Sequence, residues 1–113
     1  MTIVTVERTR VSDQLVLLVS GRMDAENAPQ FERECRACIA EGITGLVVDL
    51  GELKYVSSMG LRSFVSVGKT LQATGGTLRI CRVNGLVKQV FEITNLLGSF
   101  RVYESVEAAL IGD

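Results

Sequence analysis

Apolar residues along the chain follow two patterns: short continuous runs, and stretches in which they recur every three or four positions. A short apolar run bounded by turn residues is typical of a buried strand, whereas the three-and-four spacing is typical of an amphipathic helix. The runs predict strands at residues 3–8, 15–20, 46–50, 77–82 and 100–103. The helical spacing predicts helices between residues 24 and 42, from about 58 to 74, from 84 to 94, and after Ser105.

These elements alternate in the order β-β-α-β-α-β-α-β-α. The turn at residues 11–14 is short enough to join the first two strands as an antiparallel hairpin. The later strands are separated by helices, which implies right-handed parallel crossovers. We therefore expect an α/β fold with a mixed, mostly parallel sheet of four to five strands and about four helices. A chain of 113 residues has no room for a second core, so residues 1–113 should form a single domain.

Composition narrows the classes of function. Hydrophobic residues make up 47% and charged residues 22%, a globular balance, and the net charge of -1 lacks the basic surplus of a nucleic-acid binder. The longest apolar run near the start, residues 15–19, is too short for an export signal or a membrane span. We expect a cytoplasmic protein, with no membrane and no direct nucleic-acid partner, whose three cysteines are reduced.

The chain contains no histidine, which removes serine–histidine and cysteine–histidine catalysis and most catalytic zinc sites. Cys35 and Cys38 resemble a redox or metal pair, but they fall in mid-helix on its apolar face, and only Cys81 remains as a further thiol. Core packing is the better interpretation. We therefore predict that the protein is not an enzyme and that it binds no metal and no cofactor.

A polar segment at residues 55–60, which we call the serine corner, leads from the strand at residues 46–50 into the following helix, and it carries Ser57 and Ser58. A serine at this place can cap the helix by accepting a hydrogen bond from an unpaired backbone N–H group. It can also be a phosphoacceptor, since the start of a helix tolerates the charge of a phosphate. The residues alone leave both interpretations open.

Four short motifs follow one another along the chain: Gly21-Arg22-Met23-Asp24, then Val47-Val48-Asp49-Leu50 with Tyr55-Val56-Ser57-Ser58-Met59-Gly60-Leu61, then Gly75-Gly76-Thr77-Leu78, and finally Val87-Lys88-Gln89-Val90-Phe91. In this order they resemble the STAS domain, and within it the stand-alone bacterial anti-sigma factor antagonists. The family's central signature is a hydrophobic strand followed by Asp-Ser-Ser/Thr-Gly-Leu at the start of a helix. The resemblance covers essentially the whole chain.

The resemblance implies a switch between partners. In the family, the serine after the aspartate is phosphorylated by an anti-sigma factor that is also a serine kinase. The unphosphorylated antagonist binds that kinase and frees the sigma factor, and a PP2C-type phosphatase reverses the modification. Carried onto this chain, the phosphorylated residue is Ser58. Ser57 is the alternative acceptor, because it stands where the family has aspartate.

The sequence departs from the family at three positions: Ser57 replaces the aspartate, Met59 the second hydroxyl residue, and Arg22 a glutamate. Our hypothesis is that one patch contacts the kinase, and that it consists of Asp24, Ser57, Ser58, Met59, Gly60 and Arg62. Nothing in the sequence pattern demands a dimer, so we expect the protein to be a monomer when free. Two other roles of the same fold stay open. One is an adaptor that regulates secretion or another output without a sigma factor, and the other is a ligand-binding module or lipid-transport subunit.

Overall fold

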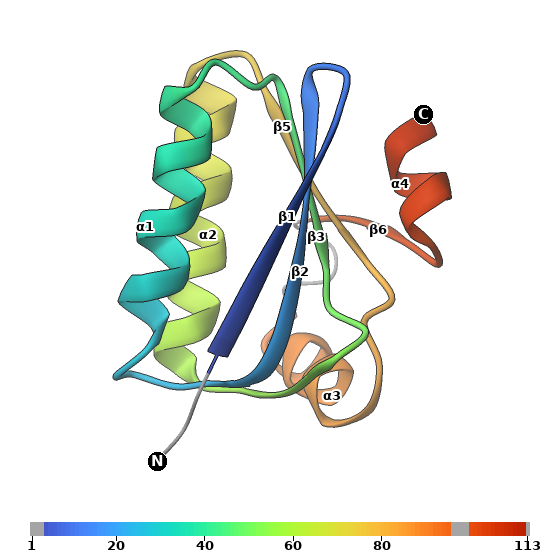
Figure 1. Ribbon diagram of the computed structural model, residues 1–113. Coiled ribbons are helices and arrows are strands. Elements are labelled where there is room, and N and C mark those ends of the chain that lie inside the picture. Colours follow the sequence, from blue (N-terminus) through green and yellow to red (C-terminus); the bar gives the residue numbers. More distant parts are fainter. Residues whose placement is uncertain (1–3, 96–99, 113) are drawn as a thin grey trace.

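A six-stranded mixed sheet forms the centre of the computed structural model, which describes residues 4–95 and 100–112 (Figure 1). The order across the sheet is β1-β2-β3-β5-β6, with β4 paired to β2. β1 and β2 are antiparallel, and the other pairs are parallel. The predicted mixed, mostly parallel sheet is confirmed. Its strands are β1 (Val4–Val11), β2 (Gln14–Met23), β3 (Gly45–Asp49), β4 (Leu53–Val56), β5 (Thr77–Cys81) and β6 (Arg101–Tyr103).

Helices cover both faces of the sheet unequally. α1 (Ala28–Ala40) and α2 (Ser58–Ala73) lie side by side on one face, and the short α4 (Val106–Ile111) lies on the other (Figure 1). Two clusters of buried side chains result, a larger one on the side of α1 and α2 and a smaller one under α4. α3 (Gly85–Ile93) joins the larger core through Val87 and Phe91. The single α/β domain with four helices agrees with the sequence-based expectation.

The sheet has one strand more than expected. Residues 53–56 form β4, where the sequence predicted only an irregular connection between the strand at residues 46–50 and the next helix. Residues 14–18 of β2 pair with β3, and residues 21–23 pair with β4, with a shift in register between Gly21 and Arg22. Four residues are too few for a period-two pattern to stand out from a loop. β4 brings the chain alongside the end of β2 and so fixes where the serine corner lies.

The structure shifts one predicted boundary and keeps another. β1 runs to Val11, three residues beyond its expected end, and the hairpin turn follows with Ser12 at φ 58°. The expected start of this strand at residue 3 lies outside the described residues. Gly75 has φ 82° just after α2, a left-handed conformation that suits glycine. Residues 75–76 therefore end a helix, as predicted.

Phenylalanine rings tie the three helices of the larger core together. Phe64 of α2 lies with its ring centroid 4.8 Å from that of Phe31 in α1 and 5.7 Å from that of Phe91 in α3. All three side chains are fully buried. Phe64 is thus the central member of the cluster, and it anchors α2 to both neighbouring helices.

The three cysteines are core residues. Cys35 and Cys38 lie fully buried on the inner face of α1, which confirms the packing interpretation of this pair. Cys81 is buried under α4 beside Val47 and Ala109. Burial raises the pKa of all three thiols, that of Cys81 to about 11, because the thiolate is poorly solvated there. A thiol that stays protonated at neutral pH is a poor nucleophile.

Candidate functional site

The serine corner begins where β2 and β4 end next to each other. The backbone N–H of Ser57 donates a hydrogen bond to the carbonyl oxygen of Met23, the last residue of β2, at 2.9 Å. Ser57 has an extended backbone (φ −88°, ψ 174°), and its Oγ accepts a hydrogen bond from the N–H of Gly60 at 3.2 Å. This is the geometry of a helix N-cap. Ser57 therefore caps α2.

Ser58 is the first residue of α2, and its side chain is exposed. Its hydroxyl makes no hydrogen bond to any residue that the structure describes. The two interpretations of the corner thus apply to different residues. Ser57 uses its hydroxyl to hold the helix start, while the hydroxyl of Ser58 is accessible to another molecule.

Replacing Ser57 by alanine should destabilise the fold without removing the exposed hydroxyl of Ser58. The loss of the capping bond should lower the free energy of unfolding by about 1 kcal/mol. Urea denaturation measures this, with Ser57→Asp as the matched control, since aspartate caps equally well. Equal midpoints for Ser57→Ala, Ser57→Asp and the natural protein would show that the bond to Gly60 contributes nothing.

Met59 and Gly60 differ in where they lie. The Met59 side chain is 44% exposed and offers an adaptable apolar contact. Gly60 is buried: a Cβ at this position would lie 2.7 Å from Cγ2 of Val56 and 3.1 Å from Sδ of Met23. Gly60 therefore lets the first turn of α2 approach β2 and β4 closely, and it lies beneath the corner instead of on its surface.

Asp24 lies in the loop from β2 to α1, directly after the residue that binds Ser57. Its Oδ1 accepts hydrogen bonds from the backbone N–H groups of Glu26 (3.0 Å) and Asn27 (3.1 Å). Asn27 returns the contact, because its Oδ1 accepts from the N–H of Asp24 at 2.8 Å and its amide donates to the carbonyl of Arg22 at 2.8 Å. These reciprocal bonds fix the loop beside the serine corner.

Arginine side chains flank the corner on two sides. Arg62 is exposed on α2 and contacts Sδ of Met59 through Nη1 at 3.9 Å. Arg22, at the end of β2, places its guanidinium 4.5 Å from the ring centroid of Tyr55 on β4, a cation–π arrangement. Sequence reasoning missed the Arg22–Tyr55 pair, because it depends on the pairing of β2 with β4. Tyr55 and Arg22 therefore extend the candidate surface beyond the predicted residues.

A groove of about 610 Å³ runs from Ser58 along α2. Leu61 and Val65 give it an apolar lining. Two of the described lining residues are charged, Arg62 and Lys69, and both are cations. Two residues of the predicted patch, Ser58 and Arg62, thus line one groove. Asp24 and Ser57 directly follow the ends of β2 and β4, which lie next to each other. The structure brings these residues to one corner of the molecule, with Gly60 below them.

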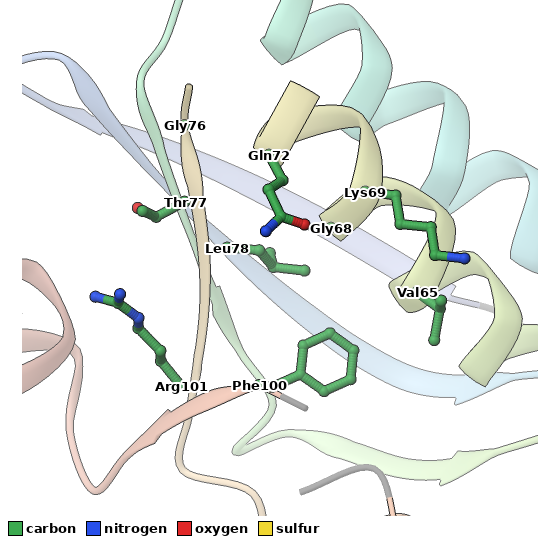
Figure 2. A pocket seen from close by; sticks show the side chains of 9 residues that line it. All are labelled: Val65, Gly68, Lys69, Gln72, Gly76, Thr77, Leu78, Phe100 and Arg101. Carbon is green, nitrogen blue, oxygen red and sulfur yellow. The ribbon is translucent and has the colours of Figure 1, made fainter. Parts of the chain in front are cut away.

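A second hollow of about 400 Å³ lies further along α2, next to β5, and Phe100 is among the residues that line it (Figure 2). Leu78 and Gln72 point into the space between α2 and β5, whereas Thr77 and Arg101 point to the other side of β5 (Figure 2). A site for a small polar ligand needs several polar groups that converge on one point. Here they diverge, so this hollow gives no support to a ligand-binding role.

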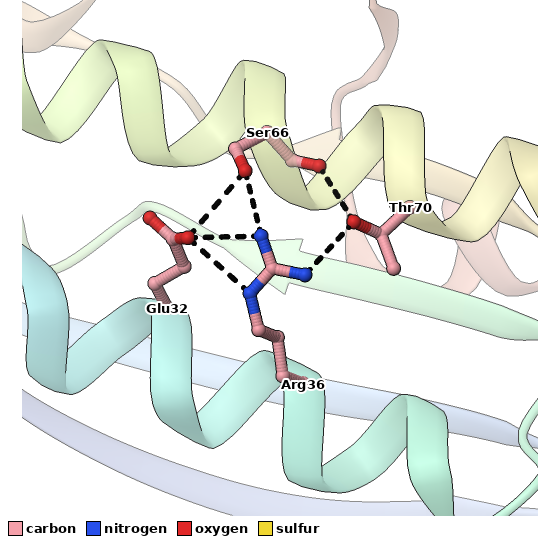
Figure 3. Close-up of polar contacts among 4 residues, drawn as sticks. All are labelled: Glu32, Arg36, Ser66 and Thr70. Atoms are coloured by element: carbon pink, nitrogen blue, oxygen red, sulfur yellow. Dashed lines mark hydrogen bonds and ion pairs between the residues drawn. The ribbon is translucent and has the colours of Figure 1, made fainter.

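Polar side chains fix α2 against α1 (Figure 3). Arg36 of α1 donates to Oε2 of Glu32 at 2.9 Å, to Oγ of Ser66 at 2.8 Å and to Oγ1 of Thr70 at 3.0 Å. The hydrogen bond from Arg36 lowers the pKa of Glu32, since it favours the ionised carboxylate. Together with the phenylalanine cluster, this network holds the helix that carries Ser58.

Other kinds of site find no support in the described residues. Within residues 4–95 and 100–112, no group of three or more potential metal-ligating side chains comes together. The helices of the same ranges are too short or too polar to cross a membrane. The serine corner, by contrast, presents the exposed hydroxyl of Ser58 on a surface held by the backbone bond from Ser57 to Met23.

The fold and the corner define a class of small α/β domain with an exposed serine at the start of the helix after β4. The chain belongs to the STAS domain family, whose sequence pattern matches residues 2–109. A Bordetella bronchiseptica protein named as an anti-sigma factor antagonist, BtrV, is 38% identical over 88% of this chain and 86% of its own length. The anti-sigma-B factor antagonist of Listeria monocytogenes is 30% identical over 94% and 92%. The crystal structure of an anti-sigma factor antagonist from Mycobacterium paratuberculosis superposes with a TM-score of 0.87, at 24% identity over 96% and 92%, and so shares the fold.

Proposed function

We propose that the protein is an anti-sigma factor antagonist that acts in a phosphorylation-controlled partner switch. The observation that carries the proposal is the division of roles at the corner: Ser57 caps α2, and the hydroxyl of Ser58 is exposed and makes no hydrogen bond to a described residue. A phosphate can therefore be added to Ser58 without breaking a contact of the fold. Membership of the STAS family and the names of the relatives support the same role.

In this proposal the unphosphorylated protein binds a serine kinase that is also the anti-sigma factor. The contact surface consists of Asp24, Ser57, Ser58, Met59 and Arg62, with Gly60 shaping it from beneath. Phosphate on Ser58 adds close to two negative charges at the centre of this surface and releases the kinase. A PP2C-type phosphatase restores the binding form. The switch works in the cytoplasm, and the protein itself performs no catalysis and pairs with the kinase as a monomer.

Ser58 is favoured over Ser57 as the phosphoacceptor for a physical reason. A phosphate on Ser57 would esterify the oxygen that accepts the N–H of Gly60, and it would add bulk and charge next to the backbone bond to Met23. The Ser58 hydroxyl accepts no hydrogen bond from a described residue, so a phosphate there disturbs no such contact. Phosphorylation at Ser58 therefore leaves the cap intact, which a reversible switch requires.

The proposal is tested by capturing the partners of the protein from its own cells, with Ser58→Ala as bait and a Ser58→Asp bait as the matched control. We expect a serine kinase to be retained by Ser58→Ala alone, and a sigma factor to be the other ligand of that kinase. If the other ligand of the kinase belongs to a secretion system, the protein is an adaptor that regulates secretion and does not control a sigma factor. Recovery of membrane transporter subunits in place of a kinase would contradict the proposal.

A further inference from the structure

Arg62 lies one helical turn beyond Ser58 on the same side of α2. Residues four positions apart on a helix are neighbours on its surface, with Cβ atoms about 5–6 Å apart. The two side chains also line the same groove, which confirms that they face the same way. Both are exposed, so the guanidinium can turn toward the hydroxyl of Ser58 or away from it.

Within the described residues, Arg62 makes no ion pair. The ion pairs there belong to Arg8, Arg36 and Arg82. The contact of Arg62 is to the sulfur of Met59 at 3.9 Å, and a thioether is a weak acceptor. Arg36 offers a contrast on the neighbouring helix, because its guanidinium is already held by Glu32, Ser66 and Thr70 (Figure 3). Arg62 can therefore take a new anionic partner without giving up an existing one.

The charges around Ser58 favour an anion on the side of the groove. Arg62 and Lys69 are the charged groups among the described lining residues, and both are positive, but only Arg62 lies near Ser58, because Lys69 is eleven residues away, about 16 Å along the helix. Asp24, the carboxylate of the predicted patch, lies in the loop between β2 and α1, where its Oδ1 accepts backbone N–H groups. A phosphate on Ser58 would thus have a cation within one helical turn on α2.

We infer that Arg62 binds the phosphate of phosphorylated Ser58 and is thereby withdrawn from the surface that contacts the kinase. The inference rests on the proposed function, since it takes Ser58 as the acceptor. The planar guanidinium can donate two parallel hydrogen bonds to phosphate oxygens, which lysine cannot do. Phosphorylation then alters the surface twice, because it adds a dianion and it also removes the cation that an acidic group of the kinase would meet.

The test measures the second ionisation of the phosphate by 31P NMR titration of the intact protein, with phosphoserine placed at position 58 during translation. Arg62→Gln should raise the pKa of the phosphate by about 0.3 unit or more relative to the natural sequence, since a nearby cation favours the dianion. Lys69→Gln is the matched control. Lys69 lines the same groove, but it lies eleven residues from Ser58 in sequence, about 16 Å along the helix, and its removal should leave the pKa unchanged.

Arg62→Lys separates charge from geometry, and it should give a pKa between those of the natural sequence and Arg62→Gln. The inference is overturned if Arg62→Gln titrates like the natural sequence, or if Lys69→Gln shifts the pKa by as much as Arg62→Gln. Neither result depends on the cellular kinase, because the phosphoserine is incorporated directly. Absence of phosphate on Ser58 in the cell would instead count against the proposed function, so the two failures are distinguishable.

Discussion

A Ser58→Asp variant should bind the kinase about a hundredfold more weakly than a Ser58→Ala variant, while the free energies of unfolding of the two differ by no more than about 1 kcal/mol, in favour of the aspartate at the helix start. The affinity falls because a negative charge at the centre of a contact surface repels a partner that is complementary to the uncharged form, and a hundredfold loss corresponds to about 2.8 kcal/mol. The fold is unaffected because the Ser58 side chain is exposed and makes no hydrogen bond to a described residue.

Titration calorimetry with the purified kinase measures this difference. Gln72→Glu is the control for added charge, because Gln72 is an exposed residue fourteen positions further along α2, about 21 Å from Ser58. It should bind like the natural protein. Equal dissociation constants for Ser58→Asp and Ser58→Ala would mean that the corner is not the switch.

Phe64→Ala should produce the largest loss of stability, about 3–5 kcal/mol in the free energy of unfolding. The ring is fully buried and contacts the rings of both Phe31 and Phe91, so its removal leaves a cavity at the junction of three helices. A loss of this size is a large share of the 5–15 kcal/mol that hold a typical domain together.

Chemical denaturation followed by circular dichroism gives the value for Phe64→Ala. Arg33→Ala, an exposed change on α1, is the control and should stay within about 0.5 kcal/mol of the natural protein. A loss below about 1 kcal/mol for Phe64→Ala would mean that α2 is not anchored by the phenylalanine cluster.

Most of the fold could be predicted because its larger elements carry strong local patterns. All five residues of β3 are buried, which matches the continuous apolar run, and Phe64 and Leu71 of α2 face inward at helical spacing. β4 could not be predicted. Its four residues form a strand because β2 is ten residues long and changes partner halfway, and that pairing is not visible in the local sequence.

The position of the candidate site could be predicted from the sequence, but the different roles of Ser57 and Ser58 could not. Two adjacent serines at a helix start are equivalent in a sequence pattern, and the extended backbone of Ser57 decides which of them caps the helix. The burial of Gly60 depends on how close Met23 and Val56 come to α2, and the stacking of Arg22 on Tyr55 depends on β4. These features arise from contacts between strands, which local periodicity does not encode.

The most direct test of the switch is the mass of the protein recovered from its own cells, followed by peptide mapping. If Ser58 is the switch, a fraction of the protein should be heavier by one phosphate, about 80 Da, located on Ser58, and this fraction should increase when the phosphatase is absent and disappear when the kinase is absent. A phosphate on Ser57, or no phosphate in any of these strains, would contradict it.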